Sequence, residues 1–136
     1  MKLFRHIEGD KFHSKKNSIA VINTDSQFSE YFLEICREYN IKILDFGKKA
    51  NYLKIFEIKK FKNFFEVRII FKNKNLKIKV NCFSEFEIYN RICALIMVFN
   101  NKLNYKHFNL INELKNPTGR LEKIYDKHKI KVFIDY

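Results

Sequence analysis

Two short apolar runs, separated by about the length of one helix, constrain the fold of this chain more than any other feature. They are SIAVIN, at residues 18–23, and IKILDFG, at residues 41–47. Apolar runs of this length are typical of buried strands. A strand, a connecting helix and a second strand within residues 18–47 make a βαβ unit, and the crossover rule predicts that its two strands pair in parallel.

The connection between the two runs has the pattern of an amphipathic helix. Asp25 or Ser26 is suited to the N-cap position, because either side-chain oxygen accepts a hydrogen bond from the first turn. The apolar side chains recur at helical spacing, which predicts that they form one stripe facing the core. These side chains are Phe28, Phe32, Ile35 and Tyr39.

The middle of the chain follows a different period. YLKIFEI (52–58), FFEVRIIF (64–71) and LKIKV (76–80) are predicted strands, and in the last two most apolar residues alternate with charged ones. A period of two is typical of antiparallel strands with one buried and one solvated face. Residues 52–80 are therefore expected to form an antiparallel section, with KNKN as the turn between its last two strands.

Two helices in succession are expected over residues 84–114. The first, at 84–101, is apolar on all sides, which predicts burial. Its start has the capping-box pattern, with Ser84 as N-cap and Glu87 three residues later. The second, at 104–114, is amphipathic, and residues 119–136 are expected to form a terminal pair of strands around the turn-like DKHK.

These elements predict a single α/β domain over residues 1–136, with a mixed sheet that combines the βαβ unit and the antiparallel section. There is no signal-peptide pattern and no apolar run long enough to span a membrane, so we expect a cytoplasmic protein. The three cysteines form no C-x-x-C pair and are expected to be reduced. Histidine and carboxylate residues show no metal-ligand spacing, and no pattern of catalytic residues is present.

The net charge of +12 leaves a basic nucleic-acid-binding module as an alternative. The basic residues, however, are 22 Lys and only 5 Arg, and they are scattered along the chain. Bidentate recognition of phosphates and bases favours arginine, so this composition argues against nucleic acid as the main partner.

Four segments resemble the central ATP-binding domain of the Mur ligases, which build the peptide of bacterial cell-wall precursors by ATP-dependent amide-bond formation. They are AVINTD (20–25), FEIYNRICAL (86–95), GRLEKI (119–124) and VFIDY (132–136). Their order and spacing agree with the family over essentially the whole chain. The GRLEKI form looks most like the enzyme that adds an amino acid to UDP-N-acetylmuramoyl-alanyl-glutamate, so a UDP-linked muramoyl peptide is the implied substrate of the complete enzyme.

The resemblance implies nucleotide contacts for four residues. Asn90, expected to be buried in its apolar helix, matches an asparagine whose amide pairs with the adenine edge. Arg120 matches an arginine that contacts the nucleotide, and Asp135 matches a carboxylate that accepts hydrogen bonds from ribose hydroxyls. Glu87 stands where the family has another asparagine; it is either a further adenine contact or only the capping residue of its helix.

Other family features are absent from these 136 residues. Three glycines, at positions 9, 47 and 119, cannot build the phosphate loop that the family uses with ATP and magnesium. The family's carbamylated lysine would fall just before Met1, and its A-H-T-P segment would follow Tyr136. We therefore expect a partial domain that is inactive alone, with two further possibilities: a second chain that supplies the phosphate loop, and self-association through an exposed sheet edge.

Overall fold

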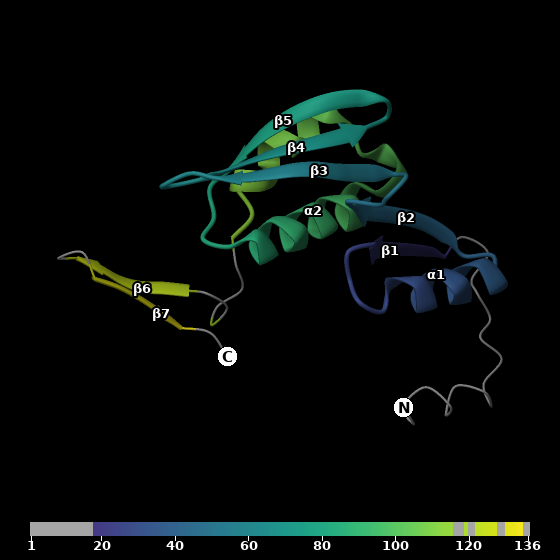
Figure 1. Cartoon of the computed structure of the whole chain (residues 1–136), viewed down its shortest axis with the longest axis horizontal. Coiled ribbons are helices and arrows are strands. Elements are labelled where there is room, and N and C mark those ends of the chain that lie inside the picture. The colour runs from purple at the N-terminus through teal and green to yellow at the C-terminus, as the bar shows by residue number, and fades with distance from the viewer. Residues whose placement is uncertain (1–17, 116–118, 120–121, 128–129, 135–136) are drawn as a thin grey trace.

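The computed structural model describes residues 18–115, 119, 122–127 and 130–134 (Figure 1). A five-stranded sheet has the strand order β1-β2-β3-β4-β5, and a two-stranded sheet is formed by β6 and β7. The strands are β1 (Ile19–Asn23), β2 (Lys42–Gly47), β3 (Leu53–Lys60), β4 (Phe65–Phe71), β5 (Lys74–Val80), β6 (Glu122–Lys127) and β7 (Ile130–Ile134). The helices are α1 (Ser29–Glu38), α2 (Glu85–Phe99), and the 3-10 helices η2 (Asn100–Lys102) and η3 (Tyr105–Asn112).

The βαβ unit is present as predicted. β1 pairs with β2 in parallel from Ile19 opposite Lys42 to Asn23 opposite Phe46. β2 in turn pairs in parallel with the start of β3, with Phe46 opposite Leu53. Successive residues of β1 point to opposite faces of the sheet and belong to two apolar clusters. Ile22 packs with α1 on one face, and Val21 packs against the main core on the other.

The first helix differs from the expectation in its start and in its buried face. α1 begins at Ser29, and Phe28 occupies the N-cap position without a side-chain cap, so neither Asp25 nor Ser26 is the cap. Leu33 and Cys36 are the buried residues of α1. The predicted stripe is wrong, because three of its members (Phe28, Phe32 and Tyr39) are exposed. The main contacts of α1 are with β1 and β2, so the helix buries a narrow stripe and leaves these rings outside it.

The antiparallel section forms as predicted, with β4 pairing with β3 and with β5. Every second residue of β4, from Phe65 to Phe71, is buried, and the residues between them are half-buried. β4 and β5 are joined by Lys72 and Asn73, both with positive φ. Two central residues with positive φ are the signature of a type I′ hairpin turn, whose twist matches that of the strands.

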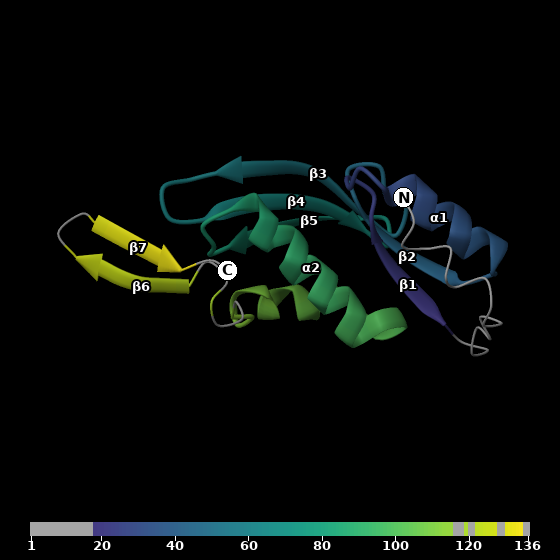
Figure 2. The same cartoon turned by 90° about the horizontal axis from the view of Figure 1, so that it is seen from below.

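α2 lies against one face of the sheet, where it contacts β1 and β2, and it supplies much of the core (Figure 2). Ile88, Ile92, Leu95 and Ile96 are buried. The expectation that α2 is buried all round is wrong for this chain, since Phe86, Met97 and Val98 are exposed. The sheet covers the helix from one side only, and no described element lies over the opposite side.

The second predicted helix is a 3-10 helix rather than an α-helix. η3 buries Phe108 and Ile111, which are three residues apart and therefore lie on the same side of a three-residue turn. The ring of Phe108 meets the ring of Phe71 edge-on, with centroids 5.5 Å apart. This contact attaches η3 to the end of β4, the central strand of the antiparallel section.

β6 and β7 form the predicted terminal hairpin, which lies apart from the five-stranded sheet (Figure 1). The described contacts to the rest of the chain centre on Phe83, in the β5–α2 connection. Its ring meets Phe133 at a centroid distance of 4.8 Å, and the Lys123 ammonium lies 5.7 Å from its centroid. The apolar side chains of Ile124, Tyr125, Ile130 and Val132 are exposed.

Candidate functional site

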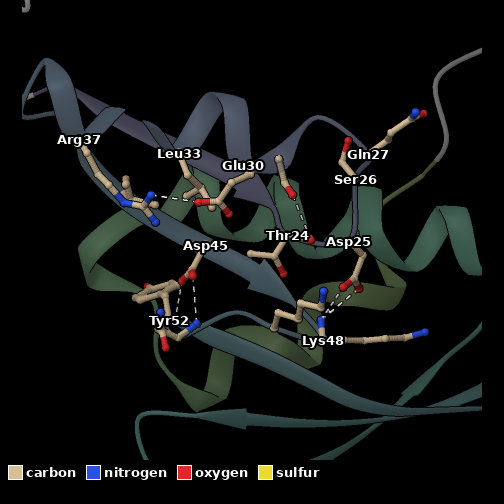
Figure 3. A pocket seen from close by; sticks show the side chains of 14 residues that line it. Thr24, Asp25, Ser26, Gln27, Glu30, Leu33, Arg37, Asp45, Lys48 and Tyr52 are labelled. Carbon is tan, nitrogen blue, oxygen red and sulfur yellow. Dashed lines mark hydrogen bonds and ion pairs between the residues drawn. The ribbon is translucent and has the colours of Figure 1, made fainter. Parts of the chain in front are cut away.

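A polar cavity of about 990 Å³ opens where β1 and β2 end (Figure 3). Its walls come from the β1–α1 connection, from α1 and from the β2–β3 connection. In open α/β sheets this is the usual place for a ligand, because loops diverge at the carboxyl ends of the parallel strands. The polar lining residues include Thr24, Asp25, Ser26, Asp45, Lys48 and Asn51.

Asp25 joins three elements at this edge. Both of its carboxylate oxygens accept from the backbone N–H of Lys48, each at 3.0 Å. Its Oδ2 also accepts from the Tyr89 hydroxyl of α2 at 2.8 Å. Asp25 therefore holds the β1–α1 and β2–β3 connections together and attaches both to α2.

Asp45 and Gly47 hold the neighbouring connection. The Asp45 carboxylate accepts from the backbone N–H groups of Asn51, at 3.0 Å, and Tyr52, at 2.7 Å. Gly47 has φ +133°, and a Cβ at this position would lie 2.5 Å from the Thr24 hydroxyl oxygen. Only glycine permits both this backbone conformation and this close approach.

In their described contacts, Asp25 and Asp45 hold neighbouring chain segments together. The buried Asp45 carboxylate is satisfied by backbone donors, as buried polar groups usually are. The exposed Asp25 carboxylate accepts from one backbone N–H and from the Tyr89 hydroxyl. Burial, followed by the hydrogen bond to Asp25, raises the pKa of the Tyr89 phenol, so Tyr89 remains a donor at neutral pH. Within the described ranges, no group of three His, Cys, Asp or Glu side chains is placed to hold a metal ion.

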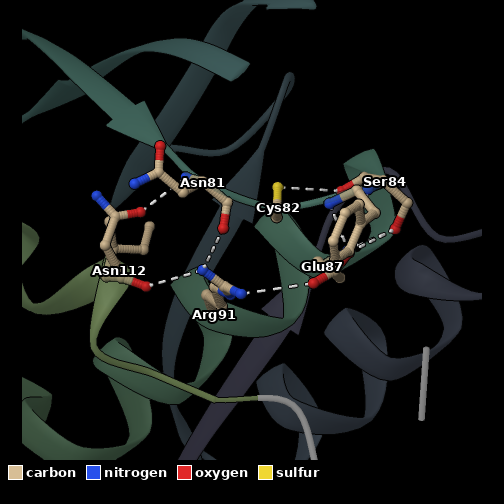
Figure 4. Close-up of polar contacts among 8 residues, drawn as sticks. Asn81, Cys82, Ser84, Glu87, Arg91 and Asn112 are labelled. Atoms are coloured by element: carbon tan, nitrogen blue, oxygen red, sulfur yellow. Dashed lines mark hydrogen bonds and ion pairs between the residues drawn. The ribbon is translucent and has the colours of Figure 1, made fainter. Parts of the chain in front are cut away.

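Glu87 lies at the start of α2 and is only 3% exposed (Figure 4). The predicted capping box is confirmed: the Ser84 hydroxyl accepts from Glu87 N–H, and Glu87 Oε1 accepts from Ser84 N–H at 3.1 Å. The same oxygen accepts from Phe83 N–H at 2.8 Å. The other oxygen, Oε2, pairs with the Arg91 guanidinium at 3.4 Å.

Arg91 extends this cluster to the 3-10 helix. Its guanidinium donates to the carbonyl oxygens of Asn81 at 3.1 Å and of Ile111 at 3.3 Å. The Asn112 side chain accepts from Asn81 N–H at 2.7 Å (Figure 4). The end of β5, the first turn of α2 and the end of η3 are thus held by one buried charge pair with its carbonyl acceptors.

Burial also affects the thiol beside this cluster. Desolvation, and next the negative charge of Glu87, raise the pKa of Cys82 to about 11. Its thiol donates to the Ser84 carbonyl oxygen at 3.4 Å. Cys82 is therefore protonated and unreactive as a nucleophile at neutral pH.

The residues that the sequence predicts to contact the nucleotide are only partly described by the structure. Asn90 lies on α2 and is exposed, so the expectation that it is buried is wrong. The reason is the one-sided cover of α2: residue 90 falls on the side that faces away from the sheet. Arg120 and Asp135 lie outside the described residues. Gly119, which precedes Arg120, has a positive φ of 77°, and its N–H donates to Glu122 Oε2 at 2.9 Å.

The solvated face of the antiparallel section carries charges that are paired with one another. Glu66 contacts Lys77 at 2.7 Å and Arg68 at 3.4 Å, while Glu57 contacts Arg68 at 3.2 Å. The hydrogen bond with Lys77 is the main cause that lowers the pKa of Glu66. Because Arg68 and Lys77 already have carboxylate partners, this face offers fewer free cations to phosphates than its composition suggests.

Sequence reasoning missed the cavity at the ends of β1 and β2. The signal was present, because Thr24 and Asp25 follow a buried strand and Gly47 ends the next one. Parallel strands bring such residues to the same sheet edge. The partner on α2, Tyr89, is 64 residues away from Asp25 in the chain and follows only from the packing of the helix.

The fold matches that of a known family. The profile of the Mur ligase middle domain matches residues 6–98, which is more than half of the chain. The chain therefore belongs to the Mur ligase family, and its mixed α/β fold is that of the family's central domain.

Two curated relatives are UDP-N-acetylmuramoyl-L-alanyl-D-glutamate–2,6-diaminopimelate ligases. The chain is 26% identical to that of Rickettsia bellii over 125 residues, covering 91% of this chain and 26% of the relative. It is 23% identical to that of Rickettsia felis over 122 residues, covering 89% and 22%. The chain thus spans about a quarter of the length of these relatives.

Solved structures show the same fold. The structure of MurF from Acinetobacter baumannii has a TM-score of 0.68 at 13% identity, with 83% of this chain and 24% of that chain covered. The MurF ligase of Thermotoga maritima, solved in complex with ADP, has a TM-score of 0.59 at 19% identity, with 85% and 26% covered. In the described residues, no helix is long and apolar enough to cross a membrane.

Proposed function

We propose that this chain is part of an ATP-dependent amide-bond ligase of peptidoglycan precursor synthesis, acting in the cytoplasm. The type we propose adds an amino acid to UDP-N-acetylmuramoyl-alanyl-glutamate. The observation that carries this proposal is the family match over residues 6–98. Two relatives that match about nine-tenths of the chain are ligases of this type, which supports the choice of substrate.

The proposed contribution of this chain is the part of the site that binds the base and the sugar of ATP. Asn90 is exposed on α2, so its amide is free to meet an adenine edge. Arg120 would supply a planar donor fork to the nucleotide, and Asp135 would accept from the ribose hydroxyls. The ADP complex of the Thermotoga maritima MurF ligase supports nucleotide as the ligand class.

Glu87 has a different role in this proposal. Its carboxylate already accepts two backbone N–H groups and pairs with Arg91. A contact with adenine would compete with all three interactions. We therefore assign Glu87 to the capping box and Asn90 to the base.

The 136 residues contain no phosphate loop, and phosphoryl transfer depends on positioned phosphate ligands and magnesium. We propose that the chain alone does not turn over ATP, and that magnesium and the triphosphate are held by the rest of the enzyme. A separate polypeptide is one possible source of that part.

Nucleotide binding by the purified chain tests this proposal. We expect weak binding of ADP by calorimetry, without ATP hydrolysis. Asn90→Ala should weaken that binding about tenfold, equivalent to about 1.4 kcal/mol, because the base loses its amide partner.

Asn109→Ala is the matched control, because Asn109 is an exposed asparagine on η3. It should leave ADP affinity unchanged. Equal affinities for wild type and Asn90→Ala would contradict the assignment of the base site, and rapid ATP hydrolysis by the chain alone would contradict its inactivity.

A further inference from the structure

A groove of about 330 Å³ lies between η3 and β5, the strand at one edge of the five-stranded sheet. It shares no lining residue with the polar cavity at the ends of β1 and β2. A groove between a sheet edge and a helix is suited to an extended peptide, which can add a strand to the sheet. The residues that line it are Leu76, Lys77, Ile78 and Lys79 of β5 and Tyr105, Phe108, Asn109 and Asn112 of η3.

The contacts after β5 show which of its backbone groups face the open edge. The Asn112 side chain accepts from Asn81 N–H at 2.7 Å and donates to the Lys79 carbonyl oxygen at 2.9 Å (Figure 4). Both backbone groups therefore point away from β4. Because such groups alternate along an antiparallel strand, Lys77 and Asn75 direct their N–H and carbonyl groups to the same open edge. Among the described strands, β5 pairs only with β4.

The Asn112 side chain occupies the place that the backbone of a neighbouring strand would take. A side-chain amide has the donor and the acceptor of a peptide group, so its two contacts imitate strand pairing. Asn112 thus ends the row of paired groups, and Lys77 and Asn75 remain for an incoming peptide. At about 3.3 Å per residue, the edge from Lys79 to Asn75 is roughly 13 Å long, which suits a strand of about four residues.

The two faces of β5 indicate which side chains the peptide carries. Ile78 and Leu76 belong to the face that packs on the core, whereas Lys77 and Lys79 are exposed on the other face. In the described part of the chain, the Lys79 ammonium contacts the Phe64 ring, at 4.5 Å from its centroid, and not a carboxylate. Side chains of adjacent strands are neighbours on each face. A peptide in which apolar and acidic residues alternate therefore matches both faces.

We propose that the β5 edge and the adjoining groove bind an extended acidic peptide segment of another protein. The peptide backbone pairs with Asn75 and Lys77, its apolar side chains enter the groove, and its carboxylates lie beside Lys77 and Lys79. This inference goes beyond the proposed function, because the surface contains none of the residues assigned to the nucleotide.

Charge argues against a second copy of the chain as the occupant. The chain has a net charge of +12, and pairing of two β5 edges would bring the lysines of both copies together. Like charges that face each other across strands are destabilising, and lysines on an edge strand discourage such pairing. An acidic strand gains from the same lysines, so the charge of the edge selects the partner.

Calorimetry of the full 136-residue chain with the end-blocked peptide EVEVEVE tests the proposal, at low salt and without nucleotide. The peptide EEVVVEE has the same composition and charge without the alternation. Asn75→Pro removes an N–H from the open edge, and Asn75→Ala is its matched control. Lys79→Glu reverses a charge beside the peptide, whereas Lys54→Glu makes the same change on β3, away from the β5 edge.

We expect EVEVEVE to bind at least about tenfold more tightly than EEVVVEE. Asn75→Pro and Lys79→Glu should each weaken binding about tenfold, and the two controls should leave it within about twofold. Circular dichroism verifies that the variants fold. If Asn75→Pro does not, two forms of EVEVEVE that are N-methylated at alternate residues decide the outcome. Only one of them should lose binding, because a paired strand directs alternate N–H groups to its neighbour.

Equal affinities for the two peptides, or equal effects of variants and controls, would overturn the proposal. The same holds if both N-methylated peptides bind or if neither does. A homodimer that Asn75→Pro disrupts would identify a second copy as the occupant instead. Tighter binding of an oligothymidine than of EVEVEVE, with the same loss in Lys79→Glu, would identify nucleic acid and would equally overturn the proposal.

Discussion

At the scale of single residues, Glu87 caps a helix and pairs with Arg91, although the family resemblance suggests that this position contacts adenine. The carboxylate accepts from Phe83 and Ser84 N–H groups and neutralises Arg91, whose side chain is only 12% exposed. Breaking a buried charge pair by removing one partner is strongly destabilising, because the other charge remains buried.

We predict that Glu87→Ala lowers the free energy of unfolding by about 3 kcal/mol. Glu87→Gln should cost less, about 1–2 kcal/mol, because glutamine also completes a capping box. Denaturation by urea followed by circular dichroism measures both. Glu85→Ala, at an exposed carboxylate in the same turn, is the control and should cost less than about 0.5 kcal/mol. Equal costs at positions 85 and 87 would refute the role of the buried pair.

At the scale of elements, the β4–β5 hairpin sets the register of the antiparallel section. Its two-residue turn places Lys72 at φ 49° and Asn73 at φ 60°. Asparagine tolerates this region, whereas a β-branched side chain does not. The Lys72 ammonium also donates to the Leu103 carbonyl oxygen at 2.8 Å, which connects the turn to the segment before η3.

The hairpin therefore predicts that the same substitution has different effects on stability at two asparagines close in sequence. Asn73→Val should destabilise the protein by about 1–2 kcal/mol, because valine is strained at positive φ. Asn73→Gly should leave stability unchanged or raise it slightly. Asn75→Val, at an exposed position within β5, should be neutral, since valine suits a strand. Thermal unfolding of the three variants tests the turn, and a neutral Asn73→Val would show that the backbone at position 73 is not left-handed.

At the scale of the whole molecule, the described residues form one large core, a smaller apolar cluster beneath α1, and a separate hairpin. The core joins β2 to β5 with α2 and η3 through residues such as Leu53, Ile69, Phe71 and Ile92, all fully buried. β6 and β7 meet the rest of the chain through Phe83. An isolated two-stranded hairpin is marginally stable in water, because it buries little apolar surface.

We predict that this division is visible in hydrogen exchange. Backbone amides of β3, β4 and β5 should exchange only through global unfolding, whereas those of residues 122–127 and 130–134 should exchange orders of magnitude faster through local opening. Exchange followed by mass spectrometry resolves the two regions. Equal protection of the hairpin and of β4 would indicate that the hairpin is packed on a larger surface than its contacts with Phe83.

The periodic signals in the sequence predicted the elements of this fold well. The alternation in FFEVRIIF and LKIKV predicted β4 and β5, and the pattern at Ser84 and Glu87 predicted the start of α2 with its capping box. These features depend on residues close in sequence, so local chemistry is sufficient to specify them. The nature of η3, a 3-10 helix, and the buried face of α1 did not follow from spacing, because both depend on what each helix packs against.

The sequence by itself therefore determined the βαβ unit, the antiparallel section and membership of a ligase family, since hydrophobic periodicity and short motifs are local properties of the chain. Only the tertiary structure decided which of the candidate polar residues are exposed. It buried Glu87 against Arg91, left Asn90 on the open side of α2 and brought Tyr89 to Asp25. The physical reason is that burial and pairing depend on which distant segments cover a surface, and a one-dimensional pattern does not contain that information.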